Sequence, residues 1–169
     1  MTHSVRQYLE EDHVRLGALL DAATADPERF DAVAFETFRA GLLRHIGIEE
    51  KLLLSTVRKL RGGVPLPEAT QLRIEHAALT SLLVPTPDAA LAQELRELLL
   101  RHDAREEGAD GIYAACEAVL GDGGAELGDK ARAYPAVPTT PHFDGDNTVR
   151  TAERALTSAA RIRPPRAHV

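Results

Sequence analysis

The stretches LLRHIGIEE, residues 42–50, and LLRHDAREE, residues 99–107, decide how this sequence folds. In both, a histidine follows leucines on the apolar side of a predicted helix, and a glutamate follows that histidine four residues later. The two pairs are His45 with Glu49 and His102 with Glu106. Side chains four residues apart in a helix stack on neighbouring turns and can reach one centre. Both stretches therefore predict helices that direct a histidine and a carboxylate inward.

Four helical segments extend outward from these stretches. Apolar residues recur at steps of three or four, no period-2 alternation is long enough for a strand, and capping residues, prolines and glycines mark the ends. The predicted ranges are about 4–24, 31–61, 67–84 and 86–121. The fourth begins with Thr86 as N-cap and runs unbroken. Short connections make neighbouring helices antiparallel, which predicts an all-α, up-down-up-down four-helix bundle over residues 1–121.

The remaining residues, 122–169, form a predicted C-terminal extension. Residues 122–146 are rich in Gly and Pro and are expected to form a loop or wrapping arm. Asn147 can cap a short fifth helix that ends before Pro164 and Pro165. The predicted organisation is one helical domain plus this extension.

Composition and charge exclude several classes of protein. Of 169 residues, 44% are apolar and 27% charged, which fits a folded globular chain. The net charge is −6, with no basic run, which argues against nucleic acid and anionic membrane surfaces as partners. No apolar stretch is long enough to span a membrane or to act as a secretion signal. The single cysteine, Cys116, favours a reducing compartment, so we expect a cytoplasmic protein.

Each predicted helix carries one histidine on its apolar stripe, close to its midpoint. These are His13, His45, His76 and His102. A single histidine at such a position is more often a hydrogen-bonded core residue than a metal ligand. Four independent histidines would all fall on a stripe this narrow on the order of 1% of the time. Antiparallel helices aligned at their midpoints would place the four imidazoles in one layer.

The two glutamates make a purely structural explanation weaker still. Glu49 and Glu106 each lie one turn beyond a histidine, and no Lys or Arg shares their stripes to neutralise them. An unpaired buried carboxylate costs several kcal/mol. Four imidazoles with two bridging carboxylates suit a pair of first-row divalent ions such as Fe, Mn, Co or Zn. Iron is favoured because nitrogen and oxygen ligands with spare positions support oxygen chemistry.

The order His, His-x3-Glu, His, His-x3-Glu on four successive helices resembles the hemerythrin-like HHE cation-binding family over residues 1–121. The resemblance implies a non-haem di-iron site in a four-helix bundle, holding two Fe ions, with Zn or Mn as alternatives. The implied metal ligands are His13, His45, Glu49, His76, His102 and Glu106.

Two positions depart from the oxygen-carrying members of that family. They have a second histidine one turn after the third-helix one, where this chain has Thr80. They also space the last acid five residues from its histidine, which would select Glu107, whereas the HHE relatives favour Glu106. We expect Thr80 near the edge of the metal-facing side, where its weak hydroxyl would leave an exchangeable coordination position.

Other residues near the ligands have two interpretations each. Tyr113 shares a helical face with Glu106 and is either a core residue or a donor to a bridging carboxylate. Glycines near the ligand layer, among them Gly17 and Gly111, provide either room for a pocket or close helix packing. Four acids adjoin ligands but face elsewhere, and one or two of them could hydrogen-bond a ligand imidazole. They are Glu50, Glu75, Asp103 and Glu107.

The expected function is binding of O₂ or a related small oxidant, such as peroxide or nitric oxide, for sensing, iron handling or redox protection. The expected partner is therefore a small diatomic or peroxide ligand. Two alternatives remain open: an oxidoreductase that decomposes peroxide at the di-iron site, and a mononuclear or zinc-binding helical bundle. The sequence does not decide whether the protein is an enzyme or what its oligomeric state is.

Overall fold

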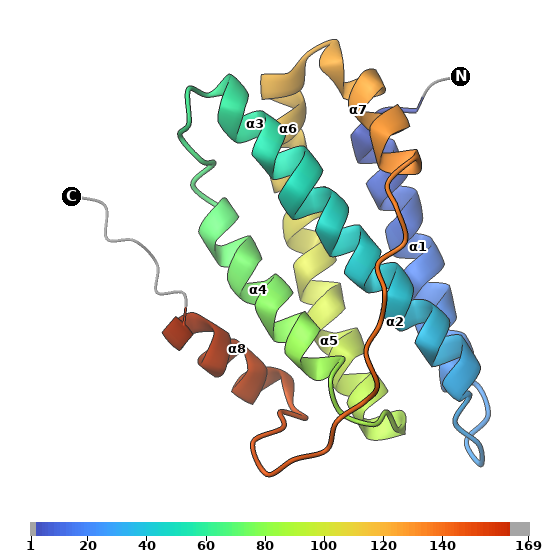
Figure 1. Ribbon diagram of the computed structural model, residues 1–169. Coiled ribbons are helices and arrows are strands. Elements are labelled where there is room, and N and C mark those ends of the chain that lie inside the picture. The colour runs from blue at the N-terminus through green and yellow to red at the C-terminus, as the bar shows by residue number, and fades with distance from the viewer. Residues whose placement is uncertain (1–2, 163–169) are drawn as a thin grey trace.

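The structure, a computed structural model, describes residues 3–162 and is all-helical, with no strand in that range. Its helices are α1 (Val5–Ala23), α2 (Ala32–Gly47), the π-helical segment η1 (Ile48–Leu53), α3 (Leu54–Leu60), α4 (Ala69–Leu82), α5 (Ala89–Glu107), α6 (Ile112–Leu120), α7 (Gly123–Arg132) and α8 (Ala152–Ile162). Figure 1 shows α1, α2, α4 and α5 side by side, with α3 continuing the line of α2. Over the described residues, no helix combines the length and apolar character needed to cross a bilayer.

Side-chain caps set the starts of the long helices. Ser4 and Gln7 form the predicted capping box of α1, and the Asp31 carboxylate accepts from two backbone N–H groups of α2. The predicted start of the fourth helix is wrong. Asp88, not Thr86, caps α5 by accepting from the N–H of Leu91, because Thr86 is hydrogen-bonded to Asp144 of the extension.

The second predicted helix is continuous but changes its winding at the ligand layer. In η1 the backbone hydrogen bonds reach five residues back, as from the N–H of Leu54 to the carbonyl of Glu49. Such π-helical turns are uncommon and occur often at functional sites. Glu49 therefore lies on a locally widened turn of the backbone.

The fourth predicted helix is broken, which corrects the expectation of one helix to residue 121. Residues 108–111 are not helical, and α6 starts anew at Ile112. Gly111 approaches the end of α5 so closely that an added Cβ would overlap the carbonyl oxygen of Glu106. The absence of a side chain at residue 111 permits this contact.

The extension is more ordered than expected. Residues 123–132, predicted as part of a loop, form α7, which lies beside α1 (Figure 1). Leu127 and Ala131 are buried, so packing overrides the weak helix propensity of the glycines around them. Arg44 of α2 binds the carbonyl oxygens of Ala131 and Tyr134 at 2.9 and 3.0 Å, which anchors the end of α7.

The predicted fifth helix is present as α8, which packs on α4 and α5. It begins at Ala152, and the expected stop at Pro164 and Pro165 lies outside the described residues. The division between residues 1–121 and 122–169 stays a prediction, and α7 and α8 share the apolar clusters of the preceding helices.

The core consists of two apolar clusters that meet at a polar layer. One contains Leu16 of α1 and Leu79 of α4, and the other contains Leu9 and Leu72 of the same two helices. His13 lies between the two leucines of α1, and His76 between those of α4. The predicted ligand layer is thus enclosed on both sides by hydrocarbon.

The close approach of Gly111 generates a stability prediction. Gly111→Ala should lower the free energy of unfolding by about 1–3 kcal/mol, because the new methyl group must displace the end of α5. Gly123→Ala is the matched control, since its Cβ meets no atom within 4 Å. It should be neutral or stabilising by up to about 1 kcal/mol. Denaturant unfolding measures both, and equal effects would contradict the close contact.

Candidate metal centre

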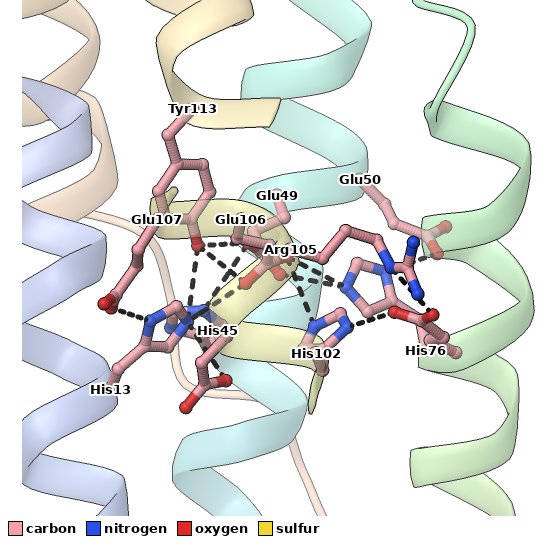
Figure 2. Close-up of polar contacts among 12 residues, drawn as sticks. His13, His45, Glu49, Glu50, His76, His102, Arg105, Glu106, Glu107 and Tyr113 are labelled. Carbon is pink, nitrogen blue, oxygen red and sulfur yellow. Dashed lines mark hydrogen bonds and ion pairs between the residues drawn. The ribbon is translucent and has the colours of Figure 1, made fainter. Parts of the chain in front are cut away.

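The structure brings all six predicted ligands into one buried layer (Figure 2). One histidine comes from each of α1, α2, α4 and α5, while one glutamate comes from η1 and the other from the last turn of α5. Glu49 and Glu106 are fully buried, and the most exposed of the six, His13, has a relative exposure of 9%.

The six side chains form two groups that could each hold a metal ion. The groups are His13, His45, Glu49 and Glu106, and Glu49, His76, His102 and Glu106. Within each group the candidate ligand atoms lie within 4.8 Å of one another. Both glutamates belong to both groups, which is the arrangement of bridging carboxylates.

The two oxygens of each glutamate face different groups. Glu49 directs Oε1 toward Nε2 of His45, at 3.6 Å, and Oε2 toward Nε2 of His76, at 3.0 Å. Glu106 directs Oε2 toward Nε2 of His13 and Oε1 toward Nε2 of His102, both at 3.2 Å. Each carboxylate therefore offers one oxygen atom to each candidate metal position.

A carboxylate holds the outer nitrogen, Nδ1, of each of the four candidate ligand histidines. The Nδ1–carboxylate pairs are His13 with Glu107 at 2.6 Å, His45 with Asp12 at 2.9 Å, His76 with Glu50 at 3.0 Å, and His102 with Glu75 at 2.9 Å. We call these four acids the outer carboxylates. Each accepts a hydrogen bond from Nδ1–H, which leaves Nε2 facing the centre as the nitrogen available to a metal.

Sequence reasoning found this outer layer only in part. One or two of the four acids next to the ligands are expected to bind an imidazole, whereas three of them do: Glu50, Glu75 and Glu107. The fourth outer carboxylate, Asp12, was missed. A signal was available, because an acid directly follows each ligand glutamate and directly precedes His13 and His76. Each outer carboxylate reaches the histidine of the next helix in the ring, so the pattern closes around the site.

Three inward-facing atoms fit a metal better than they fit one another. Glu49 Oε2, Glu106 Oε1 and His76 Nε2 are buried and form no hydrogen bond with any residue of the described chain. The His76 and Glu49 atoms are 3.0 Å apart, but their orientation is not that of a hydrogen bond. Buried polar atoms are normally paired, so these donors suit a cation bound between them.

The charges of the site are interdependent. Burial raises the pKa of Glu49, but His45 and His76 outweigh it and hold that pKa well below its usual range. Burial lowers the pKa of His13, and Glu106, Asp103 and Glu107 together raise it to about 10. Without metal, the site is therefore a network of carboxylates and protonated imidazoles.

The imidazoles of His13 and His45 face each other through their Nε2 atoms. These atoms are 2.9 Å apart, which is a hydrogen-bond distance. Burial lowers the pKa of His45, but Glu49 and Asp12 raise it to about 9. A proton on one ring can therefore be donated to the other.

Tyr113 reaches the centre from α6. Its hydroxyl donates to Oε1 of Glu49 at 2.5 Å and lies 3.2 Å from Oε2 of Glu106 and 3.3 Å from Nε2 of His13 (Figure 2). Burial and the two glutamates raise the pKa of Tyr113 well above its usual value, so the phenol keeps its proton. Of its two interpretations, the structure supports the donor to a shared carboxylate, that of Glu49.

Thr80 does not reach the ligand layer, which corrects the expectation that it lies at the edge of the metal-facing side. It is exposed, and its hydroxyl donates to the carbonyl oxygen of His76 at 2.7 Å within α4. Thr80, one helical turn beyond His76, can face solvent when His76 lies toward the edge of the buried face of α4. No exchangeable position can be assigned from residue 80.

A pocket of about 200 Å³ opens beside the His13 group, between α1, α2 and α5. His13, His45 and His102 form its inner end, together with Asp103. Leucines form its walls, and Gly17 contributes open space, since a Cβ there would meet no atom within 4 Å. Of the two interpretations of the glycines, room for a pocket holds for Gly17.

Comparisons with known proteins add no assignment: no family model, curated protein or solved structure matches this chain. The chemistry of the site therefore depends on its own residues.

The outer carboxylates generate a prediction about metal affinity. Glu107→Ala should weaken binding at one metal position by about 10–100-fold, because His13 loses the partner that orients its ring. Glu107→Gln should lose less metal affinity, since an amide oxygen still accepts a hydrogen bond from Nδ1–H of His13. Competition with a chromogenic chelator measures the affinity. Glu97→Ala is the control, an exposed carboxylate of the same helix that contacts no ligand, and an equal loss there would mean that only net charge matters.

The raised histidine pKa values generate a prediction about protons. Zinc binding at pH 7.5 should release at least one proton per chain, because metal displaces protons from His13 and His45, whose pKa values lie above that pH. Affinity should accordingly rise with pH up to about 9–10, the range of these two pKa values. A pH indicator in weakly buffered solution measures the release. Zinc binding without proton release would contradict the protonated network.

Proposed function

We propose that this protein is a hemerythrin-like four-helix bundle that holds two metal ions, iron by preference, and binds O₂ or a related small oxidant there. One observation carries the proposal: each of the two buried carboxylates presents one oxygen to each of two histidine pairs. A single ion would use only half of this arrangement.

The arrangement of the helices supports the bundle. α1, α2, α4 and α5 lie side by side in Figure 1, and each contributes one ligand histidine. Side chains on facing helices are the usual source of ligands in di-metal bundles. The order of the ligands along the chain is that of the hemerythrin-like family.

The donor set supports iron. Imidazole and carboxylate ligands suit several first-row ions, and no thiolate lies among them. Four outer carboxylates surround the two shared ones, and two of the four, Asp12 and Glu75, pair with Arg15 and Arg105. Six carboxylates around one centre favour an ion that can become trivalent, which iron and manganese can and zinc cannot.

Four protein ligands for each ion leave room for a small oxidant. When bound, the ions would supply one-electron redox chemistry at adjacent positions. The residues would orient the ligands, exclude bulk water and keep a phenol proton, that of Tyr113, near both carboxylates. These properties suit sensing, iron handling or redox protection.

Peroxide decomposition is the second candidate function. The pocket that reaches His13 and His45 from the surface favours it, because turnover requires a route for substrate and product. Steady oxygen release from hydrogen peroxide by the iron-loaded protein would select this function, and tight binding without release would select the first.

Metal content tests the proposal. We expect about two metal ions per chain after loading with iron, with absorption in the near-ultraviolet from an oxo-bridged ferric pair. Elemental analysis combined with the absorption spectrum gives both quantities. One ion per chain, or zinc alone after growth in iron-rich medium, would favour a mononuclear or zinc site.

The shared carboxylates provide a sharper test by mutation. Glu49→Gln and Glu106→Gln keep the side-chain volume but remove a charged bridging ligand, so each should lose at least one ion per chain. Glu107→Gln is the matched control one residue away, and it should retain two ions at saturating metal. Loss of metal in the Glu107 variant alone would move the ligand assignment by one residue.

A further inference from the structure

The pocket beside the His13 group is larger than a diatomic ligand needs. Its volume is about 200 Å³, whereas a water molecule occupies about 30 Å³ of liquid and an apolar cavity of about 150 Å³ can bind benzene. A molecule the size of O₂ or hydrogen peroxide would leave most of this space unfilled.

The walls of the pocket are hydrocarbon. Leu16, Leu20 and Leu42 are almost fully buried along it, and Leu99 and Leu100 complete it on the α5 side. Removing apolar surface from water contributes about 25 cal/mol per Å², so such walls bind an apolar group.

The inner end of the pocket is polar and accepts hydrogen bonds. Oδ1 of Asp103 is buried, forms no hydrogen bond with any residue between 3 and 162, and lies 3.9 Å from Nε2 of His13. The Asp103 side chain as a whole is partly exposed, so a ligand hydroxyl at this end can donate to its carboxylate. The pocket therefore combines an apolar body with one acceptor beside the candidate metal layer.

The charges around the pocket disfavour anions. Asp103 lies at the inner end and Asp21 at the outer one. Arg96, the one arginine or lysine among the lining residues, is bound to Asp21 at 2.8 Å and to the hydroxyl of Thr24 at 3.1 Å. The imidazoles of His13 and His45 already face carboxylates, so a ligand carboxylate would find no free positive partner among the lining residues.

We propose that this pocket binds a small uncharged organic molecule with one hydroxyl or hydroperoxyl group, its apolar part among the leucines and its O–H donating to Asp103. The choice of an organic hydroperoxide as the natural member of this class rests on the proposed function. The binding of the class itself rests on the pocket.

Benzyl alcohol and toluene are matched probes, because they differ by one hydroxyl group. Titrated into the zinc-loaded full-length protein, both should bind saturably and shift the leucine methyl signals of the pocket in NMR spectra. Benzoate, the charged analogue, should bind at least 10-fold more weakly than benzyl alcohol. Preferential binding of benzoate, or no saturable binding of any probe, would overturn the proposal.

Gly17 supplies a variant that fills the pocket without disturbing the fold. Gly17→Leu should lower the affinity for both probes by at least 10-fold, because the new leucine side chain would extend into open space that the ligand would occupy. Gly17→Ala gains similar helix propensity and only one methyl group, so it should change binding by less than about 3-fold. Equal affinities in wild type and Gly17→Leu would place the probes elsewhere.

Asp103 tests the orientation of the ligand. Asp103→Leu should lower the affinity for benzyl alcohol several-fold, while toluene should bind equally or more tightly, since only the alcohol loses a hydrogen bond. Parallel losses for both probes would refute the role of Asp103. The metal content of the same samples separates the two proposals. If the protein holds two ions but binds no probe, the proposed function stands and the pocket proposal fails. If it binds the probes but no metal, the pocket proposal stands and the proposed function fails.

Discussion

Two carboxylates, those of Glu49 and Glu106, lie fully buried at the centre of the molecule, where negative charge is costly without a partner. The histidines that neutralise them come from four helices, so the helices must align in height for the charges to meet. The outer carboxylates then fix the rings, and each spans from one helix to another. The alignment of the core is therefore set by charge as much as by leucine packing.

The clustering of the six candidate ligands was predictable because their spacing is local. The pairs His45 with Glu49 and His102 with Glu106 require only the helical period, and one histidine at the middle of each helix suggests a common layer. The partners of Nδ1 were harder to predict. Asp12 lies one position from His13, which turns it by about 100° toward a neighbouring helix, and its partner depends on how the helices are arranged.

Two of the errors illustrate the effect of tertiary packing. Residues 123–132 contain glycines that suggest a loop, but burial of Leu127 and Ala131 stabilises a helix there. Thr80 follows His76 at a spacing that would suit a second ligand, yet α4 is oriented so that this residue faces solvent. The local sequence pattern predicts the helical period, whereas tertiary packing decides how the helix is rotated about its own axis.

The break after α5 has an electrostatic consequence. Because the helix ends at Glu107, its C-terminal carbonyl groups lie next to the ligand layer, one residue beyond Glu106. The aligned peptide dipoles give a helix C-terminus a partial negative charge of about half an electron, which attracts cations within the last turn. An unbroken helix to residue 121 would carry that charge several turns away. The backbone itself thus contributes a field that favours positive ions at this centre.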